Sequence, residues 1–310
     1  MTQLFSPNGT PASRLTFGTM QFGGNANATQ SRAMFDAAID AAVNHFDTAY
    51  VYTDGASETL LGQMVDGNRD DLVIATKAAY VGGSTRANIL KHFDVSRDRM
   101  QMDMIDLLYL HRFDDDTPLE DTFDALATLQ KDNKIRYIGV SNFAAWQVMK
   151  AQSVAQKLGT RIDVIQPMYS LVKRQAEVEI MPMCIDQGIE IVPYSPLGGG
   201  ILTGKYARGE TGRLTEDDRY AARYGQSWMH DAATVFSALA NDLNVAPATL
   251  AVAWAAHHPS GPKPIVSARN AEQLMPSLKA MDYFMNSALY DGITALAPTP
   301  APATDRLEEA

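Results

Sequence analysis

Short apolar runs alternate with longer amphipathic stretches eight times between residues 15 and 280. A short run of this kind is typical of a buried strand, whereas the longer stretches repeat apolar residues every three or four positions, as helices do. The predicted strands cover residues 15–21, 45–49, 72–78, 104–111, 135–141, 163–169, 189–195 and 264–267. Eight such strand-then-helix units without a break predict a closed (β/α)8 barrel, the TIM-barrel fold.

The stretches between the strands predict the helices and one long loop. The predicted helices cover residues 29–44, 57–65, 84–101, 119–132, 144–158, 174–187, 231–244, 247–258 and 271–280. Ser57 and Glu58 predict a capped start for the second of these helices. Residues 196–228, which include three consecutive glycines, are predicted to form a long loop. A doubly wound sheet would need G-x-G-x-x-G after the first strand, and the Gly23-Gly24-Asn25 found there does not match it.

The same alternation of predicted strands and helices indicates the domain organisation. Because the eight units have no natural break between them, residues 1–297 are predicted to form a single barrel domain. Residues 298–310 are rich in Pro and Ala and then charged. That composition is typical of a loosely ordered tail.

Composition and charge argue against several classes of function. The net charge of −10 disfavours a nucleic-acid or anionic-membrane surface, which would need clustered Lys and Arg. The single cysteine, Cys184, cannot form an internal disulfide, which fits a reducing compartment. The N-terminus lacks the layout of a signal peptide, and no apolar run approaches the ~18–20 residues of a membrane span. His257 and His258 lack a third ligand at sensible spacing, so no metal site is predicted. We therefore expect a soluble, cytoplasmic protein.

Polar side chains stand at the end of every predicted strand. In a barrel the carboxyl ends of the strands form the face that carries the active site. The residues at or just after these ends are Thr19 and Met20, Asp47 with Tyr52, Lys77, His111, Ser141 and Asn142, Gln166, Tyr194 and Ser195, and Ser267 with Arg269. A purely structural barrel has no reason to place polar groups there eight times.

Each of these groups also has a structural interpretation. Lys77 could form a buried ion pair with Asp47, because an unpaired buried ammonium is costly. His111 could be a hydrogen-bonded core histidine, and Tyr52, like nearby Tyr50, could be a loop aromatic. Their occurrence together on the second, third and fourth strands instead predicts an acid–base cluster.

The chemistry of that cluster is specific. A phenol near pKa 10 is a poor proton donor at neutral pH, and an adjacent ammonium such as Lys77 is expected to lower that pKa. A shift of ~2–3 units corresponds to roughly 3–4 kcal/mol. A carboxylate beside Lys77 would keep the ammonium charged, and a neutral imidazole could hydrogen-bond a carbonyl oxygen. Such a site suits carbonyl reduction, for which a cofactor must supply the hydride.

Seven motifs occur in an order that is itself specific. They are FDTAYVY at 46–52, ATK at 75–77, MDMIDLLYLHR at 102–112, IGVSNF at 138–143, VIQPMYS at 164–170, PYSPLGGGILTGKY at 193–206 and PIVSARNAEQL at 264–274. On these motifs the chain closely resembles the aldo-keto reductase superfamily from about residue 15 to 282. The resemblance implies a catalytic tetrad of Asp47, Tyr52, Lys77 and His111. It makes Tyr52 the proton donor and excludes Tyr50, because the family's phenol lies five residues after the aspartate.

The same resemblance implies a cofactor that lies extended over the carboxyl face without a Rossmann domain. The side chains at 141, 142 and 166 would hold the nicotinamide carboxamide, the tyrosine at 194 would stack on the ring, and those from 195 to 213 would follow the pyrophosphate. The residues at 267, 269 and 273 resemble the adenosine end. The implied cofactor-binding residues are Thr19, Met20, Asp47, Ser141, Asn142, Gln166, Tyr194, Ser195, Leu197, Gly199, Lys205, Arg213, Ser267, Arg269 and Gln273.

The cofactor expected from this resemblance is NADPH, with NADH possible. Arg269 is the best candidate to bind a 2′-phosphate, which favours NADPH. The sequence departs from the family at two places near the adenosine. Val266-Ser267 stands where many members have Pro-Gly or Pro-Lys, and Pro276-Ser277 replaces a frequent Glu-Asn pair.

The leading hypothesis is therefore an NADPH-dependent enzyme that reduces an aldehyde or ketone, sugar-like or another small carbonyl compound. One alternative is a nucleotide-holding, redox-sensing regulatory subunit with slow turnover, because the superfamily includes channel-associated members. Another is a (β/α)8 hydrolase or isomerase that uses the same cluster. The expected partner is a small-molecule carbonyl substrate, with no nucleic acid and no membrane. The pattern predicts neither the substrate, which the variable strand-end loops would select, nor the oligomeric state.

Overall fold

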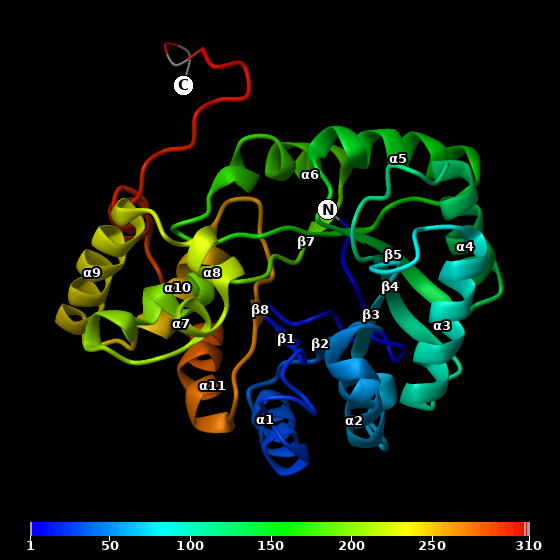
Figure 1. The fold of residues 1–310 in the computed structure, drawn as a ribbon, viewed down its shortest axis with the longest axis horizontal. Coiled ribbons are helices and arrows are strands. Elements are labelled where there is room, and N and C mark those ends of the chain that lie inside the picture. The colour runs from blue at the N-terminus through cyan, green and yellow to red at the C-terminus, as the bar shows by residue number, and fades with distance from the viewer. Residues whose placement is uncertain (1, 307, 309–310) are drawn as a thin grey trace.

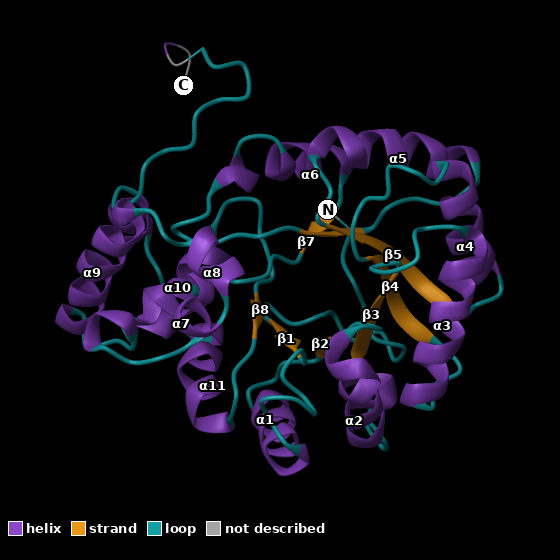
Figure 2. Cartoon of the chain, viewed as in Figure 1, coloured by secondary structure: helices purple, strands orange, loops and turns teal. Residues whose placement is uncertain are grey.

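The computed structural model describes residues 2–306 and 308. Eight strands form one parallel sheet in the order β7-β6-β5-β4-β3-β2-β1-β8 (Figure 1), with helices around the outside (Figure 2). The strands are β1 (Thr16–Gly18), β2 (His45–Asp47), β3 (Val73–Ala78), β4 (Ile105–Leu110), β5 (Ile135–Ser141), β6 (Val164–Gln166), β7 (Glu190–Ile191) and β8 (Ile265–Val266).

Backbone hydrogen bonds also connect the two edges of this sheet. The N–H of Lys263 donates to the carbonyl of Ile191 at 2.8 Å, and the N–H of Ile265 donates to the carbonyl of Pro193 at 2.8 Å. These two bonds form a seam between β7 and β8 and close the sheet on itself. The predicted (β/α)8 barrel is therefore confirmed.

Several strands end earlier than predicted. Residues 167–169 and 192–195 were expected to continue β6 and β7, but the structure places them outside the strands. Pro167 and Pro193 lie in these segments, and a proline has no N–H to donate to a strand ladder. The N–H groups of Val192 and Tyr194 still donate to the carbonyls of Ile165 and Pro167 at 2.9 Å each, so the two segments stay paired beyond the assigned strands as they pass into the loops of the carboxyl face.

The helices follow the predicted alternation, with two differences. They are α1 (Ala28–Asp40), α2 (Ala56–Met64), α3 (Arg86–Met100), α4 (Leu119–Lys131), α5 (Ala145–Lys157), α6 (Ile180–Gln187), α7 (Arg213–Glu216), α8 (Asp218–Arg223), α9 (Ser227–Asp242), α10 (Pro247–His257), α11 (Ala271–Leu278) and α12 (Ser287–Thr294). The prediction of a plain loop over 196–228 is wrong, because α7 and α8 lie within it. The side chain of Asp217 caps α8 by accepting from the N–H of Arg219.

The end of the chain adds a helix that was not predicted. Asn286 caps α12 by accepting from the N–H of Leu289 at 2.8 Å, a sequence signal that could have found it. Past α12 the chain extends away from the barrel (Figure 1). Of the predicted tail, residues 307, 309 and 310 lie outside the described residues.

An N-terminal segment covers the amino end of the barrel. Thr2 donates through its N–H to the carbonyl of Gly188, just before β7, at 2.7 Å. Phe5 donates to the hydroxyl of Tyr137 in β5 at 3.2 Å. Leu4 is fully buried and packs with residues of the barrel interior such as Val73. The opposite, carboxyl end is therefore the end at which a ligand can enter.

A tyrosine fills the barrel interior below the carboxyl face. Tyr109 in β4 is fully buried, and its register partner in β5 is Gly139. A Cβ on Gly139 would overlap the Tyr109 ring. Glycine at this position therefore makes room for the phenol inside the barrel.

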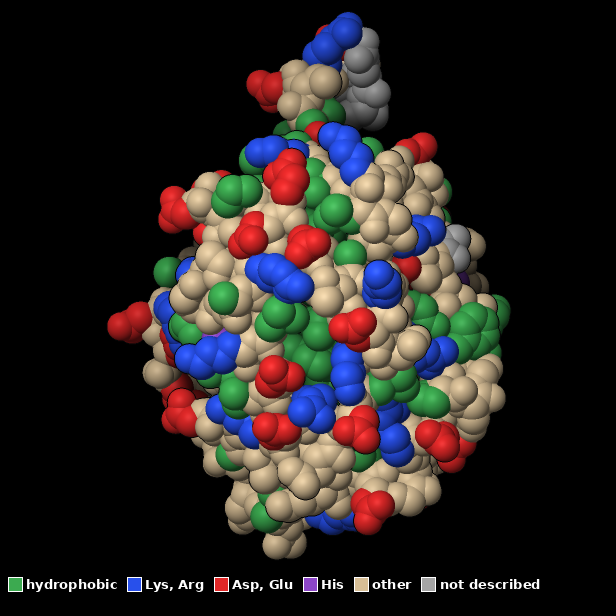
Figure 3. All heavy atoms as spheres, turned by 90° about the vertical axis from the view of Figure 1, so that its right-hand side faces the viewer, with side chains coloured by type: hydrophobic (Ala, Val, Ile, Leu, Met, Phe, Trp, Pro, Cys, Tyr) green, Lys and Arg blue, Asp and Glu red, His purple; other side chains and the backbone are tan. Residues whose placement is uncertain are grey.

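The surface over α3 and α4 mixes both signs of charge. Figure 3 shows Lys and Arg interspersed with Asp and Glu on this face, which lies at the right of Figure 1. Such a face is not a single-sign patch for a polyanion.

Among the described residues, no single helix is long and apolar enough to cross a membrane, although α9 and α10, bent by 104°, reach that length and composition as a pair.

Candidate active site

Lys77 and Asp47 form a buried ion pair at the carboxyl face. Asp47 is the last residue of β2 and Lys77 lies in β3, and their side chains are almost fully buried. The ammonium of Lys77 contacts the Asp47 carboxylate, donates to the carbonyl of Thr48 at 2.7 Å, and donates to the hydroxyl of Tyr52 at 3.3 Å. The ammonium thus joins an acid to a phenol.

The structure also separates the two candidate tyrosines. The Tyr50 ring stacks on His92, with 3.9 Å between centroids, and lies under the guanidinium of Arg99. Tyr52 instead contacts Lys77 through its hydroxyl, and the ammonium lies 4.8 Å from the centroid of its ring. Of these two tyrosines, Tyr52 is the one beside the ion pair.

A left-handed turn carries the chain from Tyr52 into α2. Thr53, Asp54 and Gly55 have φ values of 48°, 52° and 93°, a region that L-residues other than glycine seldom adopt. The Thr53 hydroxyl stabilises the turn by donating to the carbonyl of Phe22 at 2.7 Å and accepting from the N–H of Ser57 at 3.0 Å. This turn fixes the position of the phenol.

The prediction that Ser57 and Glu58 cap α2 is wrong. Gly55 is the N-cap residue, and both polar side chains are fully buried. The Ser57 hydroxyl bonds to the carbonyl of Thr19 at 2.9 Å. Glu58 accepts from Thr76 at 2.6 Å and from the guanidinium of Arg99 at 2.9 Å. These residues therefore tie the ends of β1 and β3 together behind the ion pair.

Burial, rather than Lys77, determines the pKa of the phenol. Burial raises the pKa of Tyr52, and the charge of Lys77 opposes this without reversing it. The predicted lowering is therefore wrong for this structure, and the phenol stays protonated at neutral pH. Burial also raises the pKa of Asp47 against the effect of Lys77. Burial acts to lower the pKa of the Lys77 ammonium, but Asp47 and Tyr52 outweigh it, so that pKa is raised.

His111 is a neutral imidazole at the mouth of the site. Burial, followed by the charges of Lys77 and Arg112, lowers its pKa to about 3. Its ring lies 5.8 Å from that of Tyr52 and 4.8 Å from that of Tyr80. Its Nδ1 is buried and has no hydrogen-bond partner within the described part of the chain. A neutral imidazole can hydrogen-bond a carbonyl oxygen.

This lowered pKa predicts how stability depends on pH. Because the folded pKa of His111 lies below 6.5, its contribution is fully present above pH 6.5 and is lost as pH falls toward 3. Between pH 7 and 5, we expect the protein to lose about 2 kcal/mol more of its free energy of unfolding than His111→Asn does. Urea unfolding at the two pH values measures this. His45, whose pKa is also about 3, is common to both proteins and cancels. Equal losses would contradict the prediction.

The residues implied for the nicotinamide lie together beside the ion pair. Gln166 donates to Asp47 at 2.9 Å, and its carbonyl accepts from Ser141 at 3.0 Å. Asn142 donates to the carbonyl of His111 at 3.0 Å and accepts from the Tyr194 hydroxyl at 2.7 Å. Of the two residues implied after β1, Thr19 donates to the carbonyl of Asp47 at 3.1 Å from a fully buried position, and Met20 is half-buried.

The glycine-rich segment after β7 has the shape of a phosphate cradle. Gly198, Gly199 and Gly200 have φ values of 57°, 68° and 97°, and Ser195 has 63°. A Cβ on Gly200 would come within 2.9 Å of Cε of Lys205, so the lysine lies against the bare backbone. The N–H groups of Gly198 and Gly200 donate to the carbonyls of Ser195 and Leu197 at 2.9 Å each, and the glycines let an anion approach this backbone closely because they have no Cβ.

The other implied residues of this segment lie around the cradle. Leu197 is half-buried and packs against the core. The guanidinium of Arg213 lies 5.4 Å from the centroid of the Tyr220 ring and donates to that hydroxyl at 3.4 Å.

The residues implied for the adenosine lie after β8. The hydroxyl of Ser267 is buried without a hydrogen-bond partner among the residues described, which fits a missing ligand group. The guanidinium of Arg269 pairs with Glu216 of α7 at 2.5 Å. Gln273 accepts from the backbone N–H of Arg269 at 3.4 Å. With the glycine conformations after β7, these groups fit a phosphorylated dinucleotide.

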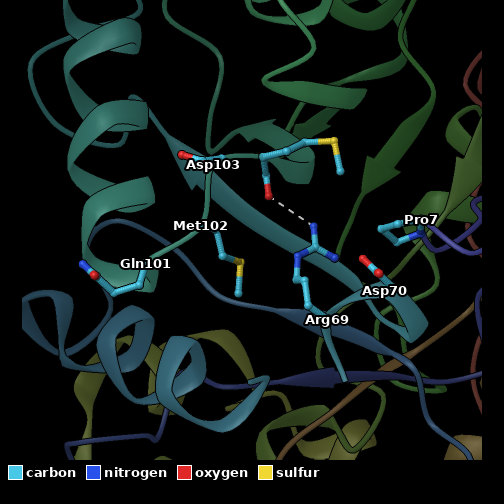
Figure 4. Close-up of a pocket in the computed structure, with 7 residues that line it drawn as sticks. Pro7, Arg69, Asp70, Gln101, Met102 and Asp103 are labelled. Atoms are coloured by element: carbon cyan, nitrogen blue, oxygen red, sulfur yellow. Dashed lines mark hydrogen bonds between the residues drawn. The ribbon is translucent and has the colours of Figure 1, made fainter. Parts of the chain in front are cut away.

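A cavity of about 240 Å³ lies at the opposite end of the barrel. Its walls come from the N-terminal segment and from the connections that precede β3 and β4. There the guanidinium of Arg69 donates to the carbonyl of Met104 at 3.2 Å (Figure 4). The lining residues are Pro7, Arg69, Asp70, Gln101, Met102, Asp103 and Met104. None of the predicted site residues is among them.

Comparison with known proteins places this arrangement in one family. The model of the Aldo/keto reductase family matches residues 14–297. Uncharacterized oxidoreductase YrpG of Bacillus subtilis (strain 168) is 32% identical over 317 residues, covering 96% of this chain and 95% of the relative. Probable voltage-gated potassium channel subunit beta of Oryza sativa subsp. japonica is 32% identical and covers 89% of both chains.

A further relative is named for a carbonyl substrate. Aflatoxin B1 aldehyde reductase member 2 of Rattus norvegicus is 34% identical over 217 residues, which is 68% of this chain and 58% of that protein. Members of the family use nicotinamide cofactors. The chain therefore belongs to the aldo/keto reductase family and is an oxidoreductase that acts on carbonyl groups.

Proposed function

We propose that the protein reduces an aldehyde or ketone to the alcohol with NADPH, and that Tyr52 is the proton donor. The observation that carries this proposal is the hydroxyl of Tyr52, 3.3 Å from the ammonium of a Lys77 that is itself paired with Asp47. The phenol is protonated at neutral pH, as a donor must be. His111 is neutral and can hold the substrate carbonyl by a hydrogen bond to its oxygen.

Tyr52, Lys77 and Asp47 then have separate roles in the reduction. NADPH, when bound, supplies the hydride to the carbonyl carbon. Tyr52 gives its proton to the oxygen, so that the hydride and the proton together convert the carbonyl to the alcohol. The phenolate left on Tyr52 lies beside the Lys77 ammonium, which stabilises the negative charge. Asp47 keeps that ammonium protonated and in place, and the proton returns to Tyr52 from solvent.

We also propose residues that hold the nucleotide. Ser141, Asn142 and Gln166 would bind the carboxamide, and Tyr194 would stack on the ring. Thr19, Met20 and Asp47 would line the bottom of the nucleotide site. The phosphates would follow Ser195, Leu197, Gly199, Lys205 and Arg213, and the adenosine would reach Ser267, Arg269 and Gln273. The glycine conformations and the unpartnered Ser267 hydroxyl support this path.

The preference for NADPH predicts that two substitutions change NADPH affinity in opposite directions. Arg269 would bind the 2′-phosphate, but Glu216 now occupies its guanidinium at 2.5 Å. We expect Arg269→Gln to weaken NADPH binding about 10-fold or more, since charge-assisted bonds to phosphate are strong. We expect Glu216→Gln to tighten it by about 2–5-fold, because an exposed pair is only weakly stabilising.

Titration of nucleotide fluorescence with NADPH and NADH in parallel measures both effects. NADH lacks the 2′-phosphate, so its Kd serves as the internal control and should stay constant. Equal changes in Kd for the two nucleotides would mean that Arg269 does not bind the 2′-phosphate.

A second function is favoured by one observation, the similarity to plant proteins named as probable voltage-gated potassium channel beta subunits. The protein would then hold the nucleotide and turn over slowly. Steady-state oxidation of NADPH against a panel of aldehydes and ketones separates the two functions. Turnover above about 1 s⁻¹ on any member is in the range of working enzymes and supports the reductase. Nucleotide that is bound but consumed only over minutes supports the regulator.

A further inference from the structure

Two cations near the site have no role in the proposed reaction. Lys173 lies in the loop between β6 and α6, and Arg223 is the last residue of α8; both are half-buried. The ammonium of Lys173 lies 5.8 Å from the centroid of the Tyr224 ring, and the guanidinium of Arg223 lies 5.1 Å from that of Tyr220. The two rings stack on each other at 6.3 Å. Each cation therefore lies over one ring of this stacked pair, Tyr220 and Tyr224, which forms an aromatic platform.

This platform borders the carboxyl face of the barrel. A Cβ on Gly199 would come within 3.0 Å of the Tyr224 ring and 3.1 Å of the Tyr220 ring, so both rings lie against the glycine segment after β7. Tyr220 is near enough to Tyr52 to add to the rise in its pKa, after burial and Asp47. Burial raises the pKa of Tyr194 to about 12, and the charge of Arg223 opposes that rise. Arg223 therefore acts on Tyr194, and the Tyr220 ring on which Arg223 lies is the one that acts on Tyr52.

The pair is electrostatically costly as it stands. Within the described residues neither Lys173 nor Arg223 forms an ion pair, whereas Arg99, Arg174 and Lys263 each pair with a glutamate. Among the described half-buried cations, Lys134, Lys205 and Arg213 also form no ion pair, and the last two are those proposed for the cofactor phosphates. Burial, and then the charge of Arg223, lowers the pKa of Lys173. Two like charges that are partly removed from water and lack a counter-ion favour an anionic ligand.

The proposed path of the cofactor phosphates includes neither Lys173 nor Arg223, although Arg213 of that path also lies over the Tyr220 ring, 5.4 Å from its centroid. The charged neighbours that act on Lys205 are Arg269, Glu216, Glu210 and Arg213, and Arg223 is not among them. Lys205 and Arg269 thus belong to the pyrophosphate and adenosine side. Arg223, whose charge acts on Tyr194, is placed instead to meet the substrate.

We propose that Arg223 and Lys173 bind an anionic substituent, a carboxylate or a phosphate, of a substrate whose carbonyl reacts at Tyr52. This inference rests on the proposed reductase function and narrows its substrate class to carbonyl compounds that carry a negative charge away from the reacting carbon. A guanidinium matches either anion with two parallel hydrogen bonds, and the ammonium adds a second positive charge. The stacked tyrosines hold both cations in place.

Matched substrates test the proposal. We would compare kcat/KM for 4-carboxybenzaldehyde and its methyl ester, and for glyceraldehyde 3-phosphate and glyceraldehyde, with saturating NADPH. The protein should prefer the charged member of at least one pair by about 10-fold or more, and the pair that shows it identifies the anion. Arg223→Gln should lower kcat/KM for that charged member about 10–100-fold and for its neutral partner less than about 3-fold. Lys173→Gln should act in the same direction more weakly, and Arg223→Lys should recover part of the loss.

Two controls separate this role from others. Arg219→Gln changes a more exposed arginine of the same helix that is already paired with Asp217, and it should leave the preference intact. The Kd for NADPH should be the same in the protein and in Arg223→Gln, which also shows that the variant is folded. A weakened Kd for NADPH, or an equal loss on charged and neutral substrates, overturns the proposal. A preference for the neutral members by the unaltered protein overturns it too.

A binding measurement keeps the test independent of turnover. Calorimetry on the NADPH complex of Tyr52→Phe compares the acid with its ester and the phosphate with glyceraldehyde. Tighter binding of a charged member that is lost in Tyr52→Phe/Arg223→Gln supports the anion site, even if the unaltered protein reduces none of the four compounds. That combination, together with no turnover on any member of the aldehyde and ketone panel, would refute the reductase function alone. Indifference to charge in binding and in turnover refutes the anion site alone.

Discussion

Replacing Tyr52 with Phe is expected to lower kcat for carbonyl reduction by about 10²–10⁴-fold, the range typical of a general acid. The change removes only the hydroxyl that lies 3.3 Å from the ammonium of Lys77, and the ring keeps its packing on His111. The Kd for NADPH should remain within about 2-fold, because the proposed nucleotide contacts are made by other residues. Steady-state kinetics and a fluorescence titration measure the two quantities.

The chain supplies a matched control for this experiment at Tyr50. That ring stacks on His92 and under Arg99, away from Lys77. Tyr50→Phe removes the same atom two residues earlier and should retain most of the activity. If Tyr52→Phe reduces carbonyls as fast as Tyr50→Phe, the assignment of Tyr52 as proton donor is wrong.

Lys77→Met should destabilise the protein as well as inactivate it. The change leaves the carboxylate of Asp47 buried with the amide of Gln166 as its remaining side-chain partner. Breaking a buried pair in this way costs about 3–5 kcal/mol of the free energy of unfolding. It also removes the charge that stabilises the phenolate, which should lower kcat by roughly 10²–10³-fold. Urea unfolding and steady-state kinetics measure the two losses.

A second substitution distinguishes the two effects. Lys77→Met combined with Asp47→Asn removes the unpaired charge, so part of the lost stability should return while kcat stays low. Recovery of kcat together with stability would show that Lys77 serves only the fold. A single variant as stable as the unaltered protein would show that the buried pair contributes nothing.

The barrel and the group of residues at its site could be predicted because both follow from local sequence patterns. Alternating apolar runs specify strands and helices wherever they fold, and in a parallel barrel the strand ends must meet on one face. Asp47, Lys77 and His111 each lie within one residue of the end of a strand, so the topology alone brings them together. Choosing Tyr52 over Tyr50 needed the family resemblance, since the spacing alone leaves both phenols on the same turn.

The features that could not be predicted depend on contacts between distant segments. Ser57 and Glu58 have the composition of a helix cap, but Arg99, 41 residues away from Glu58, provides the partner that keeps this glutamate buried. The direction of the Tyr52 pKa depends on how much burial opposes one nearby charge, and burial cannot be read from the spacing of residues. Arg223 was not singled out, because nothing local indicates that α8 faces the site.

The seam between β7 and β8 makes barrel closure unequal around the ring. Each of these strands has two residues, and two backbone bonds join them, whereas β4 and β5 share a ladder of five register pairs. Local opening needs less free energy where fewer bonds must break, so thermal fluctuations are expected to be larger at this seam than between β4 and β5. Tyr194 and Ser267, proposed to contact opposite ends of one nucleotide, stand on either side of it. A nucleotide that contacts both sides of the seam would bind the closed barrel more tightly than the opened one. Nucleotide binding would therefore stabilise the closed barrel, and the two equilibria would be coupled.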